Sequence, residues 1–278
     1  MKIQVLIENT ALETGAQKAL WHEHGLSLLI KADGHRILFD TGKSGRFAEN
    51  ADLLGIDLSE VETVVLSHGH YDHGGGILTF LERNRRAKVY IQDRAFENHM
   101  ARRGDGHLDD IGISEEIRKS PQVVLLSGDS RMNENMMLFT SVKSSRLLSG
   151  SNRVLLMRSG PDYVQDTFAH EQNLLLTAEG KRVLISGCAH RGIVNIMERA
   201  MELAGGPPDA VIGGFHLSNP GEGGTEPEEL VNGVADYLDS FSARYYTCHC
   251  TGLPAYRMLK ERLGEKITYI SAGMEFEL

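Results

Sequence analysis

The chain has 278 residues, 41% of them hydrophobic, which is enough to bury the core of one large α/β domain. Its formal net charge of -9 disfavours nucleic-acid or membrane-surface partners, because both attract an excess of lysine and arginine. No stretch has the apolar length of a membrane span, the N-terminal residues predict a strand rather than a signal peptide, and three cysteines do not suggest a secreted disulfide framework. We therefore expect a cytoplasmic protein that acts on a small molecule.

Short β-rich runs dominate the first half of the chain. They predict strands at Ile3–Ile7, Leu26–Ile30, Arg36–Phe39, Thr63–Leu66 and Lys88–Ile91. The pattern weakens over about residues 95–150, where we expect a helical stretch, a glycine-containing loop at Arg103–Gly106 and short strands near Val123–Leu126 and Met137–Ser141. Since long irregular segments in compact domains are usually functional or mobile, this region is predicted to be a lid-like insertion in a single domain over residues 1–278.

The second half repeats the alternation of strands and helices. Strands are predicted at Asn173–Thr177, Arg182–Ser186, Ala210–Gly213 and Tyr245–Thr247. Helices are predicted near Ile193–Leu203, Pro227–Leu238 and Pro254–Leu263. Two such halves, each with a sheet and helices, predict an α/β fold of the αββα sandwich type.

A cluster of metal-ligand side chains follows the predicted strand at Thr63–Leu66. The cluster is an HxHxDH pattern followed by three glycines, and its members are His68, His70, Asp72 and His73. His68 and His70 can point to one side of an extended segment, while the glycines permit a tight turn behind them. Neutral imidazoles with one carboxylate suit Zn²⁺, with iron or manganese as alternatives. The segment therefore predicts a metal site.

This arrangement resembles the metallo-β-lactamase superfamily, whose hallmark is HxHxDH after a strand and whose fold has two β-sheets flanked by helices. The resemblance implies a binuclear centre, with two zinc ions expected. It also implies that Asp40, in Phe39-Asp40-Thr41-Gly42, orients a metal ligand or a bound water.

The second half offers further ligands at strand ends. Cys188 stands where much of the superfamily has a bridging aspartate, and His190 follows two residues later; we favour His190 and leave Cys188 open between ligand and core residue. His249 matches the last histidine motif of the superfamily and is expected to be a ligand. Strand alternation would point Cys248 and Cys250 away from it.

Two more histidines have open roles. His170 is the nearest counterpart of the third superfamily motif, and either ligates metal or lines the pocket. His216 follows a predicted strand and is better suited to substrate contact or general acid catalysis than to ligation, with a structural role as the alternative.

Several motifs together resemble one subfamily, named after dihydropterin ribofuranosylaminobenzene 5′-phosphate synthase. They are Glu23-His24-Gly25-Leu26-Ser27, the HxHxDHGGG run, His170-Glu171-Gln172, Gly187-Cys188-Ala189-His190-Arg191-Gly192-Ile193, Gly213-Gly214-Phe215-His216 and His249-Cys250-Thr251-Gly252. His170 stands where the subfamily pattern leads us to expect an aspartate. The resemblance implies pocket roles for Glu23, His24 and His170. Arg191 could help to hold a phosphate.

These features predict a metal-dependent hydrolase or transferase for a small phosphorylated or pterin-like substrate. The metals would lower the pKa of a water, and Asp72 would orient that water or accept a proton. One alternative is a di-iron redox enzyme, although such sites usually have glutamate where this chain has His70. The other is a non-catalytic metal-binding protein, which would have a closed metal shell.

Overall fold

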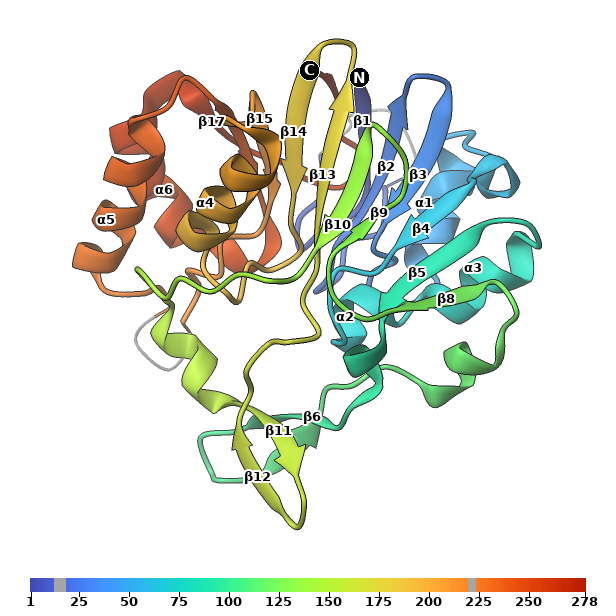
Figure 1. The fold of residues 1–278 in the computed structure, drawn as a ribbon, viewed down its shortest axis with the longest axis horizontal. Helices are drawn as coiled ribbons and strands as arrows, with labels where there is room; N and C mark the ends of the chain where they lie inside the picture. Colours follow the sequence, from blue (N-terminus) through green and yellow to red (C-terminus); the bar gives the residue numbers. More distant parts are fainter. Residues whose placement is uncertain (13–18, 220–223) are drawn as a thin grey trace. The chain divides into compact units, whose positions relative to one another are not determined.

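The computed structural model describes residues 1–12, 19–219 and 224–278 of the chain (Figure 1). The chain forms two compact units. The first consists of Met1–Phe96, Gly112–Ser127 and Ile270–Leu278, and the second of Glu97–Ile111 and Gly128–Tyr269. Among the described residues, no helix is both long and apolar enough to cross a membrane.

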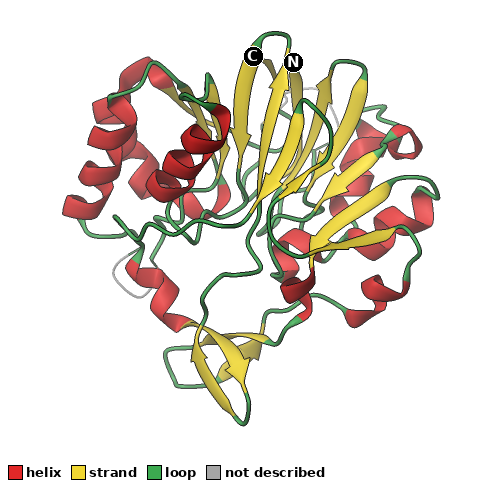
Figure 2. Ribbon diagram, viewed as in Figure 1, coloured by secondary structure: helices red, strands yellow, loops and turns green. Residues whose placement is uncertain are grey.

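The first unit contains a mixed seven-stranded sheet with helices packed on it (Figure 2). The strand order is β18 (Glu275–Glu277), β1 (Lys2–Ile7), β2 (Ser27–Ala32), β3 (His35–Phe39), β4 (Thr63–Val65), β5 (Lys88–Gln92) and β8 (Val123–Leu126). The strands from β3 to β8 run parallel, and parallel strands usually need cover on both faces. Helices α1 (Arg46–Leu53) and α3 (Ile77–Arg83) contribute buried phenylalanines to the core of this unit.

The second unit contains another seven-stranded sheet. The strand order is β17 (Ile267–Tyr269), β16 (Arg244–Thr247), β15 (Ala210–Gly213), β14 (Lys181–Ile185), β13 (Asn173–Ala178), β10 (Met136–Phe139) and β9 (Ser130–Arg131). The strands from β14 to β17 run parallel. Their hydrophobic partners come from α4 (Ile193–Ala204), α5 (Glu228–Asp239) and α6 (Leu253–Leu263). Because parallel strands point their carboxyl ends to one edge, the loops after β14, β15 and β16 meet there.

A small antiparallel sheet completes the second unit. Its strand order is β12 (Asp162–Gln165), β11 (Leu155–Ser159), β6 (His99–Arg102) and β7 (Leu108–Asp110). Within the described residues, the remaining helical turns are α2 (Tyr71–Gly74), η1 (Leu58–Glu60), η2 (Asp93–Phe96), η3 (Glu115–Lys119), η4 (Gly150–Val154), η6 (His249–Thr251) and η7 (Gly264–Lys266).

The strands and helices that were predicted with bounds are all present, and their ends differ by at most two residues. The helical stretch expected within residues 95–150 is present only as short turns such as η3. The region 95–150 contributes strands to all three sheets: β6 and β7 to the small sheet, β8 to the first unit, and β9 and β10 to the second. Its role as a lid, and the single-domain organisation, stay predictions.

A buried carboxylate ties two loops of the second unit together. Glu226 accepts hydrogen bonds from Ser149 Oγ at 2.6 Å, Ser151 N at 2.8 Å and Asn219 Nδ2 at 3.0 Å. Burial raises the pKa of this carboxyl, but the hydrogen bonds from Ser149 and from backbone amides outweigh burial and lower the pKa below its usual 4.5. The ionised carboxylate therefore stabilises the folded chain.

We expect Glu226→Gln to lower the free energy of unfolding by about 2 kcal/mol at neutral pH, since hydrogen bonds to a charged group are lost. A carboxyl group whose pKa is lower in the folded chain stabilises the fold at pH values above its unfolded pKa of 4.5. This stabilisation is lost as the pH falls through the folded pKa. Urea unfolding of both proteins from pH 7 to pH 3 should show the difference shrinking below about pH 4.5. The exposed Glu229→Gln is the control. A difference independent of pH would contradict the assignment.

Candidate metal centre

The first unit gathers the side chains of the HxHxDH motif after the end of β4. His68, His70, Asp72 and His73 are buried, with exposed fractions of 1%, 5%, 7% and 0%. The ring centroid of His68 lies 4.5 Å from that of His70 and 4.2 Å from that of His73. Asp72 Oδ2 lies 3.6 Å from His73 Nε2. Three imidazoles and a carboxylate, all of them zinc-ligand types, are thus gathered in one buried cluster.

Helical backbone brings the last two of these side chains round. α2 begins at Tyr71, directly after His70, and the amide of His73 donates to the carbonyl of His70 over 3.1 Å. The sequence led us to expect a glycine turn, but Gly75 and Gly76 have ordinary φ angles of -63° and -85°. Glycine is needed instead for close packing, because a Cβ on Gly75 would lie 2.1 Å from a backbone carbonyl oxygen.

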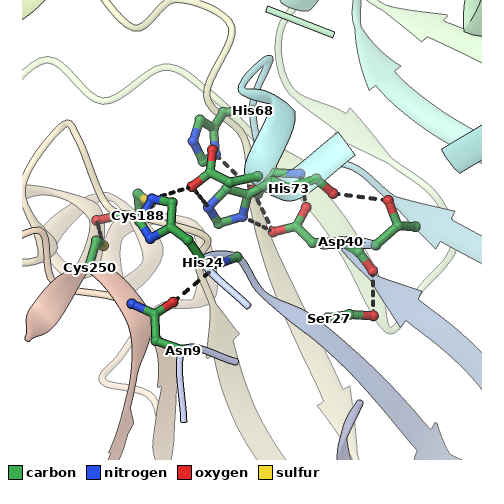
Figure 3. A network of polar contacts seen from close by, with 12 residues as sticks. Asn9, His24, Ser27, Asp40, His68, His73, Cys188 and Cys250 are labelled. Atoms are coloured by element: carbon green, nitrogen blue, oxygen red, sulfur yellow. Dashed lines mark hydrogen bonds and ion pairs between the residues drawn. The ribbon is translucent and has the colours of Figure 1, made fainter. Parts of the chain in front are cut away.

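Asp40 lies beside the cluster and is hydrogen-bonded to its neighbour Ser67 and to its member His73 (Figure 3). Its carboxylate is 1% exposed and accepts hydrogen bonds from Ser67 N, Ser67 Oγ and His73 Nδ1, each at 2.7 Å. With Nδ1 of His73 donating to Asp40, Nε2 is the nitrogen left to bind a cation. The residue itself has a φ of 59°, an unusual value for aspartate, and its carbonyl accepts a hydrogen bond from Ser27 Oγ at 2.9 Å. Asp40 is thus placed to orient a metal ligand, as the family resemblance implied.

Ser67 is a functional candidate that the sequence analysis missed. It lies between β4 and the motif, and its hydroxyl is 2.9 Å from His68 Nδ1 as well as 2.7 Å from Asp40 Oδ2. One serine therefore links the carboxylate to a second histidine of the cluster. The one feature of the sequence that could have indicated this role is the position of Ser67 directly before His68.

The two residues of the Glu23-His24 motif differ in role. His24 Nε2 lies 3.3 Å from Asp72 Oδ2, and more than half of the His24 side chain is exposed, so His24 marks the solvent side of the cluster. Glu23 instead accepts hydrogen bonds from the amides of Lys43 and Ser44 at 3.1 and 2.9 Å. Glu23 therefore positions the loop after Asp40.

In the second unit, His190 is held on several sides. Its ring stacks on Phe168 with centroids 4.5 Å apart and an interplanar angle of 3°. Its Nδ1 lies 3.0 Å from Asn152 Oδ1, and its amide donates to Glu171 Oε1 over 2.6 Å. These contacts fix the ring through Nδ1 and leave Nε2 as the candidate ligand atom.

Glu171 is a buried carboxylate in the same loop system. Burial raises its pKa to about 7, although hydrogen bonds from the amides of Arg191 and His190 oppose the rise.

The Arg191 guanidinium donates to the carbonyls of Val142 and Thr167 at 2.8 and 3.4 Å. Arg191 thus anchors neighbouring loops, a role that the sequence did not indicate.

His170 belongs to a buried trio in the second unit. Asp166 Oδ2 lies 2.9 Å from His99 Nδ1 and 3.3 Å from His170 Nε2, and the two rings are 3.9 Å apart. Burial raises the pKa of Asp166, but its hydrogen bonds to His170 and His99 outweigh burial and hold it well below the usual value. Sequence reasoning missed His99 and Asp166, which come from β6 and from the residue after β12.

The last candidates surround the carboxyl ends of β14, β15 and β16. Ligand atoms of Cys188, His216 and Cys250 lie within 4.8 Å of one another, and both cysteines are buried. β16 ends at Thr247 and η6 covers the residues that follow, so the expected strand alternation does not extend to Cys250. His249 lies in η6, is 2% exposed and has a φ of 50°.

Comparison with known proteins agrees with the motif and the fold. Residues 21–137 match the model of the metallo-beta-lactamase superfamily. The 7,8-dihydropterin-6-methyl-4-(beta-D-ribofuranosyl)-aminobenzene-5'-phosphate synthase of Methanocaldococcus jannaschii is 28% identical over 98% of this chain and 95% of its own length. An uncharacterised protein of the same organism is 29% identical over 93% of this chain and 94% of its own length.

Solved structures show the same fold over the whole chain. A crystal structure described as Tm1679, a metal-dependent hydrolase of the beta-lactamase superfamily, has a TM-score of 0.82 and 27% identity, covering 100% of this chain and 99% of the other. Zn²⁺-bound PqqB from Methylobacterium extorquens covers 100% of both chains with a TM-score of 0.56 and 14% identity, a likeness of fold alone. The predicted fold class is confirmed. In its HxHxDH cluster, in the family model that residues 21–137 match and in its fold, the chain is thus similar to proteins of the metallo-β-lactamase superfamily.

Proposed function

We propose that this protein is a metal-dependent hydrolase or transferase acting on a small phosphorylated or pterin-like molecule through a binuclear metal site. The observation that carries the proposal is the convergence of three imidazoles and the Asp72 carboxylate in the first unit, with Asp40 bonded to His73 behind them. Buried histidines held through one ring nitrogen are characteristic of metal ligands.

The donor chemistry favours zinc. The proposed ligands are His68, His70, Asp72, His73, His190, His249 and Cys188. Imidazole, carboxylate and thiolate together suit Zn²⁺, with iron and manganese as alternatives, whereas Ca²⁺ and Mg²⁺ prefer oxygen donors. When bound, the ions supply an electrophile for a substrate oxygen and a water of lowered pKa.

The side chains of the first unit suggest how the reaction is divided among residues. Asp72 Oδ2 is close to both His73 and the exposed His24, so Asp72 is placed to orient a water or to accept its proton. Asp40 keeps His73 in the tautomer that binds through Nε2. His24, on the solvent side, is placed to contact a substrate.

The substrate class rests on the relatives. The relative of Methanocaldococcus jannaschii is named as a synthase of a pterin-linked ribofuranosyl aminobenzene phosphate, and the Tm1679 structure is described as a hydrolase. A net charge of -9 also favours a small ligand over a polyanion. We therefore propose a phosphorylated or pterin-like substrate, and leave group transfer and hydrolysis to be separated by assay.

The test is activity before and after metal removal. Protein stripped with a chelator and then reconstituted with zinc, iron or manganese should be assayed on phosphomonoesters, phosphodiesters and reduced pterin phosphates. We expect no turnover by the stripped protein and recovery once at least about two ions per chain are bound. Turnover that survives complete metal removal, or a fully loaded protein inactive on the whole panel, would contradict the proposal.

A further inference from the structure

The second unit contains a thiol-rich cluster that the proposed binuclear site explains only in part, through Cys188. We call Cys188, His216 and Cys250 the thiol cluster. Their ligand atoms lie within 4.8 Å of one another, and the exposed fractions of Cys188 and Cys250 are 3% and 8%. Cys250 Sγ also lies 3.4 Å from the carbonyl oxygen of Cys188, and Figure 3 shows these two cysteines side by side.

The order of strands in the sheet explains why these three side chains lie close together. Cys188 follows β14, His216 follows β15 and Cys250 follows β16, and these three strands are consecutive and parallel. Their carboxyl ends open at one edge, the usual location of ligand sites in parallel sheets. The cluster thus joins three segments that are far apart in the sequence.

The loops show close packing around the cluster. A Cβ on Gly214 would lie 2.4 Å from Cys250 Sγ, so only glycine leaves room for the thiol there. The amide of Phe215 donates to Thr251 Oγ1 over 2.9 Å, which joins the loop of His216 to that of Cys250. His216 itself has a φ of 51°, a strained value that costs about 1 kcal/mol or more and persists where surrounding structure enforces it.

The imidazole of His216 supplies an independent sign of a missing ligand. Both of its ring nitrogens are buried, and neither has a hydrogen-bond partner of normal geometry within the described parts of the chain. A buried polar group without a partner costs about 1–3 kcal/mol. A cation bound to one nitrogen would remove that penalty at one of the two positions.

We propose that Cys188, His216 and Cys250 form a site for a thiophilic divalent cation, with zinc as the expected ion. Two thiolates and one imidazole are a known zinc ligand set, and a fourth position stays open to water or another ligand. Binding releases the thiol protons to solvent. This site shares Cys188 with the proposed binuclear ligand set, and it goes beyond the proposed function because it adds His216 and Cys250, which that set does not include. It also replaces the acid role that the sequence suggested for His216.

Cobalt substitution tests the site directly. Metal-free, reduced protein is titrated with Co²⁺, and thiolate-to-cobalt charge-transfer absorption is followed in the near ultraviolet. We expect a strong band in the wild type and loss of about half of it or more in both Cys188→Ser and Cys250→Ser, because each removes one of two thiolates. His216→Ala should weaken cobalt binding at this band by about tenfold or more. Cys248→Ser is the matched control, since Cys248 is a neighbouring buried cysteine outside the cluster.

Several results would overturn the proposal. They are the absence of a band in the wild type, a band unchanged by Cys250→Ser, a loss equally large in Cys248→Ser, and thiol counting that finds a disulfide between Cys188 and Cys250. Loss in Cys188→Ser alone would place its thiolate at the binuclear centre without Cys250, and would also overturn it.

Two further measurements keep the test independent of variant folding and of the proposed function. X-ray absorption of the zinc-loaded wild type should show zinc–sulfur distances of about 2.3 Å, and a spectrum without sulfur neighbours would refute the site. Asp72→Asn should lose turnover yet keep the cobalt band. Failure of the proposed function and failure of the thiol cluster are therefore separate outcomes.

Discussion

Asp72→Asn is expected to lower turnover by about a thousandfold or more while the protein stays folded, because a positioned carboxylate that orients water or takes a proton typically contributes 10²–10⁴-fold. The Asp72 side chain is 10% exposed, and its Oδ2 is 3.6 Å from His73 Nε2 and 3.3 Å from His24 Nε2. Asparagine keeps the shape of the residue within α2 but removes the charge and one acceptor oxygen. The chemistry should therefore fail without loss of packing.

The measurement combines the rate on the best substrate of the panel with metal content per chain and circular dichroism. Asp52→Asn is the matched control, since Asp52 is an exposed aspartate of the same unit whose carboxylate pairs with Arg83 at 2.7 Å. That variant should keep the wild-type rate. If the Asp72→Asn protein kept its full metal content and the wild-type rate, Asp72 would have no part in the reaction.

Asp40→Ala should cost about 3–5 kcal/mol of folding free energy, because it leaves buried donors without their charged partner. Three hydrogen bonds disappear together, two from Ser67 and one from His73, each 2.7 Å long. The same change frees the His73 ring to rotate and to change tautomer. Loss of such an orienting partner typically weakens metal binding by about 10–100-fold.

Urea unfolding of metal-free protein measures the first effect, and competition with a chromogenic chelator measures the second. Asp40→Asn provides the graded comparison, since an amide oxygen still accepts but an amide nitrogen cannot accept from His73. We expect Asp40→Asn to fall between wild type and Asp40→Ala in both measurements. Equal unfolding midpoints and equal metal affinities for all three proteins would show that the Asp40 network is not needed.

The sheets were readable from the sequence where strands are buried and apolar. Thr63–Val65 and Ala210–Gly213 each lie between two parallel neighbouring strands and are almost wholly buried, which gives short continuous apolar runs. β12 was missed for the opposite reason. All four of its residues are exposed, so it carries no apolar alternation, and it exists by pairing with β11.

The same contrast holds for the site. The HxHxDH motif is local, so its ligands are visible within six residues of sequence. The pairing of His99 with Asp166 spans 67 residues, and the pattern around either residue gives no hint of the other. The contact of Cys250 with Cys188 spans 62 residues and depends on the order of strands in the sheet. Such constellations follow from topology.

Anomalous diffraction at the zinc absorption edge, from crystals of zinc-loaded protein, tests the central claim most directly. We predict metal peaks within about 2.0–2.2 Å of ligand atoms of His68, His70, Asp72 and His73. Peaks that avoid all four of these side chains, in protein whose turnover requires zinc, would contradict the account.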